Sequence, residues 1–343
     1  MNEHTRTAQP NAPAAPEAAA PWLKPNVRLS LLRAAMRALG GISVRHAARW
    51  MDHLWFSAPR TKPRDTDQAW LDSATPLSFN VHQRHVAGWS WGDSGPAIVL
   101  VHGWGGNAGH LCSLVAPLRR LGFRVIAFDA PAHGVSSPSR LGGKRVTFFE
   151  MAEALRVVTA SEPALCGVVA HSGGCAVVAL AMREGWQPPS RLAFVAPFAL
   201  PSTAIDSFAR AISATPAVVG AFREGVQSWL GHPWSYLDIA NTPERCQRPL
   251  LVMHDVQDKE VPVEQAQSIL RTWPSARLET THGLGHRRIL RDAGVIQQLA
   301  AFMALALEGA KSAADATPAA SRDELDLAYE ASGSIWTKVA HRG

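Results

Sequence analysis

Between about residues 77 and 307, two patterns of apolar positions alternate along the chain. Short, almost wholly apolar runs predict buried strands, and longer stretches with an apolar residue every three or four positions predict helices. The pattern opens with two alternating segments, 77–81 and 85–91, which predict an antiparallel pair. Regular alternation of strand and helix follows. This order is typical of an α/β fold with a mostly parallel central sheet flanked by helices.

The alternation has one interruption and two flanks. The further predicted strands are 97–101, 124–128, 168–171, 192–195, 250–253 and 276–280, and the predicted helices are 111–121, 148–159, 173–182, 263–273 and 289–307. Moderately apolar, helical sequence at 201–243 predicts a small helical cap insertion. An alanine-rich stretch after residue 309 predicts a linker and tail over 310–343. We therefore place the main domain at 65–309.

The segment 22–64 predicts a basic, amphipathic helical extension. Apolar positions over 28–56 form two helical faces, and Gly40-Gly41 predicts the break between them. The formal net charge of +6 is concentrated here. The basic residues are Lys24, Arg28, Arg33, Arg37, Arg45, Arg49, Arg60, Lys62 and Arg64, and the acid is Asp52. Two interpretations stay open: helices packed on the domain with arginines in water, which we favour, or helices lying on an anionic membrane.

Composition narrows the class of protein. The 343 residues are 47% hydrophobic and 18% charged, which is typical of a globular domain with a large core. No apolar stretch reaches the roughly 18 residues of a membrane span. Residues 1–21 lack the basic start and apolar stretch of a signal peptide, so we predict a disordered leader and a cytoplasmic location. The charge comes without a nucleic-acid reader motif, so we expect no nucleic-acid partner.

The four cysteines are widely spaced. They are Cys112, Cys166, Cys175 and Cys246, and they match neither a metal-binding spacing nor a disulfide framework. We expect free thiols and no bound metal.

The stretch around Ser172 carries the first chemical signal. An apolar run ends at Ala170-His171-Ser172-Gly173-Gly174 and a second apolar run follows, which predicts a strand, a sharp turn and a helix. Small residues two before and two after the serine, here Ala170 and Gly174, let the flanking backbones pass while the hydroxyl points away from the sheet. Here the chain resembles the α/β-hydrolase superfamily, whose nucleophile elbow reads Gly-x-Ser-x-Gly. Alanine replaces the first glycine.

A second motif follows the strand at 97–101. His102-Gly103-Trp104-Gly105-Gly106 resembles the superfamily's oxyanion loop. The resemblance implies that the backbone N–H groups of Trp104 and Gly173 form an oxyanion hole, and that His102 shapes the loop.

The same stretch also fits a competing interpretation. Gly103-x-Gly105-x-x-Ala108, with Asp129 ending the next strand, matches a dinucleotide-binding fingerprint. We favour the hydrolase interpretation, because Asp129-Ala130-Pro131-Ala132-His133-Gly134 matches a structured turn of that superfamily. No cofactor is then expected.

Acid and base candidates lie further along the chain. The resemblance places the triad acid at Asp258, after the strand 250–253. Asp255 is a second candidate, whose alternative role is in the turn, and Asp206 is a more distant third. Gly285-His286, in a loop before the closing helix, matches the position of the base, which leaves His282 as a rim residue.

The order Ser172, Asp258, His286 is the order that the superfamily requires. The resemblance implies a serine hydrolase that cleaves small carboxylic esters through an acyl-enzyme. Trp104 and the cap aromatics Phe208, Phe222, Trp229, Trp234 and Tyr236 suggest an apolar pocket for short to medium acyl chains, although aromatics in a helical insertion also form cap core. A thioesterase, lactonase or acyltransferase would share the motifs. A hydrolase-fold protein that binds a small ligand without turnover is the alternative from another class. The oligomeric state stays open.

Overall fold

The computed structural model describes residues 27–242 and 247–316. The predicted leader, the tail from residue 317 onward and Cys246 lie outside these ranges. The described cysteines, Cys112, Cys166 and Cys175, are free thiols.

Eight strands form one sheet in the order β1-β2-β4-β3-β5-β6-β7-β8. The strands are β1 (Thr75–Val81), β2 (Arg84–Trp91), β3 (Ala97–Val101), β4 (Arg124–Phe128), β5 (Leu165–His171), β6 (Arg191–Val195), β7 (Leu250–Asp255) and β8 (Ala276–Thr281). β2 pairs antiparallel with both β1 and β4, and every later pairing is parallel. The predicted antiparallel start and parallel centre are confirmed.

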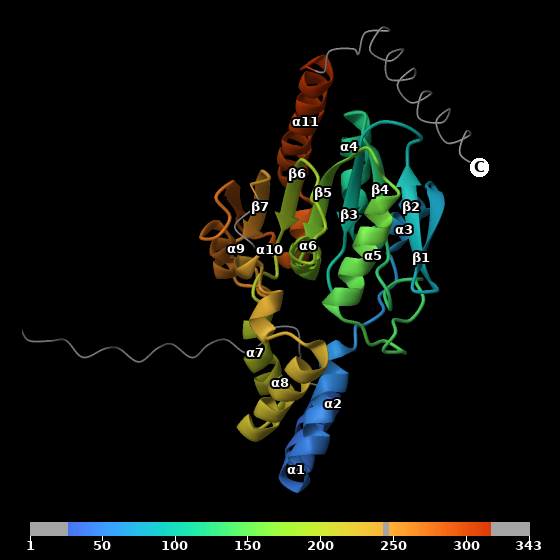
Figure 1. Cartoon of the computed structure of the whole chain (residues 1–343). Coiled ribbons are helices and arrows are strands. Elements are labelled where there is room, and N and C mark those ends of the chain that lie inside the picture. The colour runs from blue at the N-terminus through green and yellow to red at the C-terminus, as the bar shows by residue number, and fades with distance from the viewer. Residues whose placement is uncertain (1–26, 243–246, 317–343) are drawn as a thin grey trace, which may run out of the picture.

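Helices cover both faces of this sheet (Figure 1). α5 (Phe148–Ala160), α6 (Gly173–Arg183) and α9 (Val263–Leu270) pack on one face, while α3 (Asp65–Asp72), α4 (Val115–Arg120) and α11 (Ala293–Ala316) pack on the other. Every residue of β3 and β7 is buried, which explains their continuous apolar runs. The strand ends therefore have little freedom to move.

Four helices stand together at one end of the sheet (Figure 1). They are α1 (Val27–Ile42), α2 (Val44–Phe56), α7 (Pro201–Ile212) and α8 (Pro216–Leu230), followed by short 3₁₀ turns at Trp234–Leu237 and Ile239–Asn241. One apolar cluster joins Met36 and Met51 to Ile205, Val218 and Phe222. The N-terminal extension and the insertion, predicted as separate units, thus form one structure, which we call the four-helix cap.

The predicted break at Gly40-Gly41 is wrong. α1 continues to Ile42, and the break falls at Ser43, whose side chain caps α2. Gly40 serves close packing instead, because a Cβ there would lie 3.2 Å from Val218 Cγ2. Contact with α8 outweighs the helix-weakening effect of glycine.

Three other predicted elements have different bounds. The helix predicted at 111–121 begins as a 3₁₀ turn, Ala108–Leu114, before α4. The helix predicted at 289–307 is divided by Asp292, whose side chain accepts the Val295 N–H and starts α11. α11 then continues to Ala316, into the stretch predicted as linker. The short helix α3 lacked an amphipathic pattern long enough to be predicted.

Candidate active site

Ser172 occupies a strained turn between β5 and α6. Its φ of 55° and ψ of −123° lie outside the regions that non-glycine residues favour. Small neighbours make this turn possible. A Cβ on Gly174 would lie 2.6 Å from the His102 carbonyl oxygen, and one on Gly103 would lie 2.8 Å from Ser172 Cβ. The turn between β5 and α6 thus places the Ser172 hydroxyl at the carboxyl end of the sheet.

His286 connects this hydroxyl to a buried carboxylate. Ser172 Oγ lies 2.9 Å from His286 Nε2, and His286 Nδ1 lies 2.7 Å from Asp258 Oδ2. Because an ionised carboxylate only accepts, His286 donates its Nδ1–H to Asp258 and offers Nε2 to the serine O–H. All three residues follow strand ends, from β5, β7 and β8.

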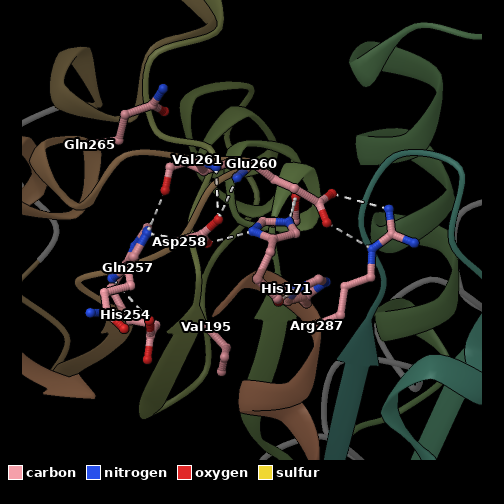
Figure 2. A network of polar contacts seen from close by, with 12 residues as sticks. His171, Val195, His254, Gln257, Asp258, Glu260, Val261, Gln265 and Arg287 are labelled. Atoms are coloured by element: carbon pink, nitrogen blue, oxygen red, sulfur yellow. Dashed lines mark hydrogen bonds and ion pairs between the residues drawn. The ribbon is translucent and has the colours of Figure 1, made fainter. Parts of the chain in front are cut away.

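Asp258 stays ionised although its side chain is fully buried. Burial by itself raises the pKa of this carboxyl, but the His254 ring 3.5 Å away, the hydrogen bond from His286 and the Val261 amide hold that pKa well below its usual range. Oδ1 accepts the N–H groups of Glu260 and Val261 at 2.8 and 3.0 Å (Figure 2). The carboxylate can therefore orient a histidine and stabilise its protonated form.

The other acid candidates have different partners. His286 lies in the short helix α10 (Gly285–Arg288), where the sequence predicts a loop. Asp255 accepts Thr281 Oγ1–H at 2.8 Å and the Leu284 N–H at 2.9 Å, so its carboxylate holds the segment that leads into α10. Those and further backbone donors outweigh its burial and lower its pKa. Asp206 is exposed in the four-helix cap and pairs with Arg223 at 2.8 Å. Neither carboxylate has a hydrogen bond to His286 among the described residues.

Two backbone amides face the space beside Ser172. A Cβ on Gly173 would lie 3.3 Å from the Trp104 nitrogen, so the two N–H groups predicted to form an oxyanion hole are neighbours. Neither amide has a hydrogen-bond partner in ranges 27–242 and 247–316. Their donors are free to meet a developing negative charge.

Buried histidines hold the loop that contains Trp104. His102 Nε2 accepts the Ala130 N–H, and His133 Nε2 accepts the Gly105 N–H, each at 3.0 Å. The opposite ring nitrogens then donate to the carbonyl oxygens of Gly103 and Pro131. Burial lowers the pKa of both histidines, to about 3 for His133, so they act as neutral hydrogen-bonding groups.

The dinucleotide interpretation conflicts with Asp129. One carboxylate oxygen accepts the Ala108 N–H and the other the Val135 N–H, both at 2.8 Å, and the residue is only 2% exposed. Both oxygens are thus used in holding backbone and do not face solvent. Asp129 therefore offers no free carboxylate oxygen to the hydroxyl groups of a ribose.

Comparison with known proteins supports the fold. Residues 96–217 match a family model described as alpha/beta hydrolase fold. An esterase structure from Pyrococcus furiosus is 19% identical. The match covers 74% of this chain and 96% of the esterase chain, with a TM-score of 0.53. An esterase from Exiguobacterium antarcticum is 17% identical. That match covers 67% of this chain and 99% of the esterase chain, also with a TM-score of 0.53. The chain is an α/β-hydrolase-fold protein.

A curated relative matches a shorter stretch of this hydrolase-fold chain. A serine hydrolase-like protein of Danio rerio is 35% identical over 103 residues. The match spans 30% of this chain and 31% of that relative's length. The predicted resemblance to the α/β-hydrolase superfamily and the predicted fold are confirmed.

The sequence did not single out His254, which supports the acid of this α/β hydrolase fold. Its Nε2 donates to the Val261 carbonyl at 2.9 Å and lies 3.5 Å from Asp258 Oδ2 (Figure 2). A polar side chain that follows the apolar run Leu250–Met253 within the wholly buried β7 was the available signal, since such a group must find a buried partner.

His171 and His282 take different positions. His171 is buried, and its Nε2–H donates to the His286 carbonyl oxygen at 3.0 Å, so it anchors the short helix α10 that carries the candidate base. Burial holds the pKa of His171 well below its ordinary value, which keeps it neutral. His282 is exposed, and its position at the rim stays a prediction.

The predicted aromatic pocket needs correction. Phe222 and Trp234 are 2% and 5% exposed and pack with Phe208 and Trp55 in the interior of the four-helix cap. They form cap core because the N-terminal helices supply the opposite face. Trp229 is 45% exposed, with its ring edge on Phe56. Tyr236 stacks on His232.

Aromatic rings beside the site come from the core instead. Trp104 packs at 71° against Phe148, with the ring centroids 5.7 Å apart. A Cβ on Gly173 would lie 3.2 Å from Phe148 Cζ, which places this ring next to the free amides.

A hollow of about 660 Å³ lies elsewhere. It includes Leu165, at the opposite end of β5 from Ser172, and Trp186 beyond α6. Among the described residues, no group of three or more histidine, cysteine or acidic side chains could hold a metal ion.

Proposed function

We propose that this protein is a serine hydrolase that cleaves carboxylic esters through an acyl-enzyme. One observation carries the proposal: the hydrogen-bonded chain from Ser172 Oγ through His286 to Asp258, with links of 2.9 and 2.7 Å. A serine hydroxyl is a weak nucleophile until a base removes its proton. Histidine is suited to this step, and the buried carboxylate stabilises the imidazolium that forms.

The reaction proceeds in two halves. Ser172 Oγ attacks the ester carbonyl while His286 Nε2 takes the hydroxyl proton, and the N–H groups of Trp104 and Gly173 bind the oxyanion. Each such donor is worth on the order of 3 kcal/mol in comparable sites. His286 then protonates the leaving alcohol, which leaves an acyl group on Ser172. Water, deprotonated by His286, attacks that ester, and the acid departs as Ser172 regains its proton.

The substrate side of the proposal is narrower. Trp104 and Phe148 give the space beside the amides an apolar wall, which supports short to medium acyl chains. Ester hydrolysis across a series of p-nitrophenyl esters tests the chain length. A rate on palmitate equal to that on acetate or butyrate would contradict this part.

Labelling with a fluorophosphonate probe, followed by peptide mapping, tests the nucleophile. We expect the label on Ser172 and hydrolysis of p-nitrophenyl butyrate by the wild type. Ser172→Ala should lose the label and at least 10⁴-fold of kcat. Ser30→Ala is the matched control, since this serine is exposed on α1 and should keep both.

Two results would refute the assignment. A label that persists in Ser172→Ala would place the nucleophile elsewhere. Absence of both labelling and turnover would favour a hydrolase-fold protein that binds a small ligand. Thioester and lactone substrates, run alongside, would show whether esters are the preferred class.

A further inference from the structure

Helix α1 has two apolar faces, of which only one is buried. Leu29, Met36 and Gly40 face inward, while Val27, Leu31 and Ile42 are 76%, 63% and 84% exposed. A helix turns about 100° per residue, so the exposed three fall with Ala34, Ala35 and Ala38 inside an arc of about 100°. These six residues form a continuous strip about 22 Å long, from 1.5 Å of rise per residue. We call it the α1 strip.

Arginines border the α1 strip. By the same helical geometry, Arg28 lies along one side of the strip and Arg37 along the other. Arg45 and Arg49 are exposed on the adjoining α2. None of these four guanidinium groups has an ion-pair partner within ranges 27–242 and 247–316. Asp52, the acid of these two helices, already binds Arg145 of the core at 2.6 Å.

Apolar residues bordered by unpaired arginines match the surface of a bilayer that contains anionic lipids. The apolar strip can enter the boundary between headgroups and acyl chains, while arginine side chains reach the phosphates. We propose that the α1 strip docks the protein on an anionic lipid surface. The inward face of α1 is still packed on the cap, so docking needs no unfolding.

Two alternative occupants fit less well. A symmetric contact with a second copy would gather the arginines that border both strips at one interface, with no acid on α1 to compensate. A protein partner is most often held by large aromatic anchors in pockets. The α1 strip offers a smooth row of alanine and aliphatic side chains.

The fold also gives the docked molecule an orientation. The four-helix cap stands beyond the carboxyl end of β6, which leads directly into α7 (Figure 1). Ser172 follows the carboxyl end of the neighbouring β5. Docking through α1 therefore turns the cap side of the molecule toward the lipid, and the far end of α11 away from it.

No single helix among the described residues is long and apolar enough to span a membrane. By length and composition, only the pair Gly285–Arg291 and Ala293–Leu307, bent by 64°, reaches that length and apolarity together.

Co-sedimentation of the full chain with vesicles tests the proposal. Vesicles of phosphatidylcholine with phosphatidylglycerol should bind the wild type, and pure phosphatidylcholine vesicles should bind it at least tenfold more weakly. L31E/I42E should lose at least tenfold in affinity for the anionic vesicles. The matched control, L121E/L270E, places the same charges on two leucines of the core surface, each 38% exposed, and should bind as the wild type.

A second variant tests the charges. R28Q/R37Q should weaken binding about 25-fold, from about fivefold per arginine near an anionic surface. High salt should weaken binding by the wild type as well, because exposed charges are screened. Thermal unfolding midpoints close to that of the wild type show that the variants fold.

Four outcomes would overturn the proposal. They are failure of the wild type to bind anionic vesicles, equal binding to neutral vesicles, wild-type binding by L31E/I42E, and a solution dimer that L31E/I42E dissociates without any vesicle binding. The last result would assign the α1 strip to a second copy. None of these readouts depends on ester hydrolysis, so a failure here is distinguishable from a failure of the proposed activity.

Discussion

Asp258 in the core and Asp238 in the four-helix cap are both buried aspartates, yet their pKa values shift in opposite directions. Burial raises the pKa of both. Around Asp258, histidine and backbone donors outweigh it and lower the pKa. Around Asp238, hydrogen bonds from the Ser202 N–H and hydroxyl are too few, and the pKa stays raised. The surroundings of Asp258 favour the charged carboxylate, whereas those of Asp238 do not.

The same contrast extends to the two regions. Around the site, directional hydrogen bonds hold each loop: His102 and His133 hold one side, and Asp255 and His171 the other. The cap is held mainly by packing of aliphatic and aromatic side chains. Directional bonds define positions to fractions of an ångström, and apolar packing defines them less strictly. The candidate site is thus held mainly by hydrogen bonds, and the four-helix cap mainly by apolar packing.

The largest expected effect separates the two aspartates. Asp258→Asn should lower kcat by about 10⁴-fold, because a neutral amide neither orients the correct tautomer of His286 nor stabilises its charge. Asp238→Asn should change kcat less than threefold. Rates of p-nitrophenyl ester hydrolysis measure both. Similar losses in the two variants would show that the site and the cap are not separable in this way.

A cavity in the cap should reduce stability but spare the nucleophile. Phe222 is 2% exposed and packs on Trp55 and Trp234, so Phe222→Ala should lower the unfolding free energy by about 3–5 kcal/mol. Urea unfolding measures this loss, and fluorophosphonate labelling of the folded variant should persist. Phe128→Ala, at the end of β4 next to Asp129, is the core counterpart and should impair both. Equal loss of labelling would contradict the separation.

The buried histidines should make stability depend on pH. The pKa of His133 falls from about 6.5 in the unfolded chain to about 3 in the fold. Between about pH 6.5 and pH 3 the imidazole is therefore protonated in the unfolded chain but neutral in the folded chain. As the pH is lowered through this range, the unfolding free energy falls by up to about 1.4 kcal/mol per pH unit. His133→Asn should show a shallower slope between pH 6.5 and 4.5 in urea titrations.

The control for that slope is His282→Asn. Its side chain is exposed, and it contacts water in both states, so the wild-type slope should persist. An unchanged slope in His133→Asn would show that this imidazole gains its proton without loss of the fold.

The residues of the candidate site were predictable because each follows a strand. Ser172 and Asp258 lie in short motifs after the apolar runs of β5 and β7, and His286 follows β8. Parallel strands bring their carboxyl ends together at one edge of the sheet. His254 was not singled out, because its partner Asp258 depends on how the following turn folds back. Backbone donors such as the Val261 N–H carry no side-chain signal at all.

The cap was predicted only in its parts. Helical periodicity marked 28–56 and 201–243 separately, but it contains no information about which apolar faces meet. Gly40 shows the limit: its dipeptide predicted a break, and only the presence of Val218 from a distant segment explains a glycine inside a helix. For the same reason, the sequence left open whether Phe222 and Trp234 line a pocket or form cap core.

The join between α1 and α7 also has a consequence for synthesis. Arg33 Nε donates to the Ala211 carbonyl across 178 positions of chain. At about 5–20 residues per second, the ribosome reaches Ala211 roughly 9–36 s after Arg33. During that interval the inward face of α1 has emerged without its partner, and the whole sheet up to β6 is made first. The inward face of α1 therefore stays uncovered while six strands of the sheet are synthesised, and it can pack only once α7 has been made.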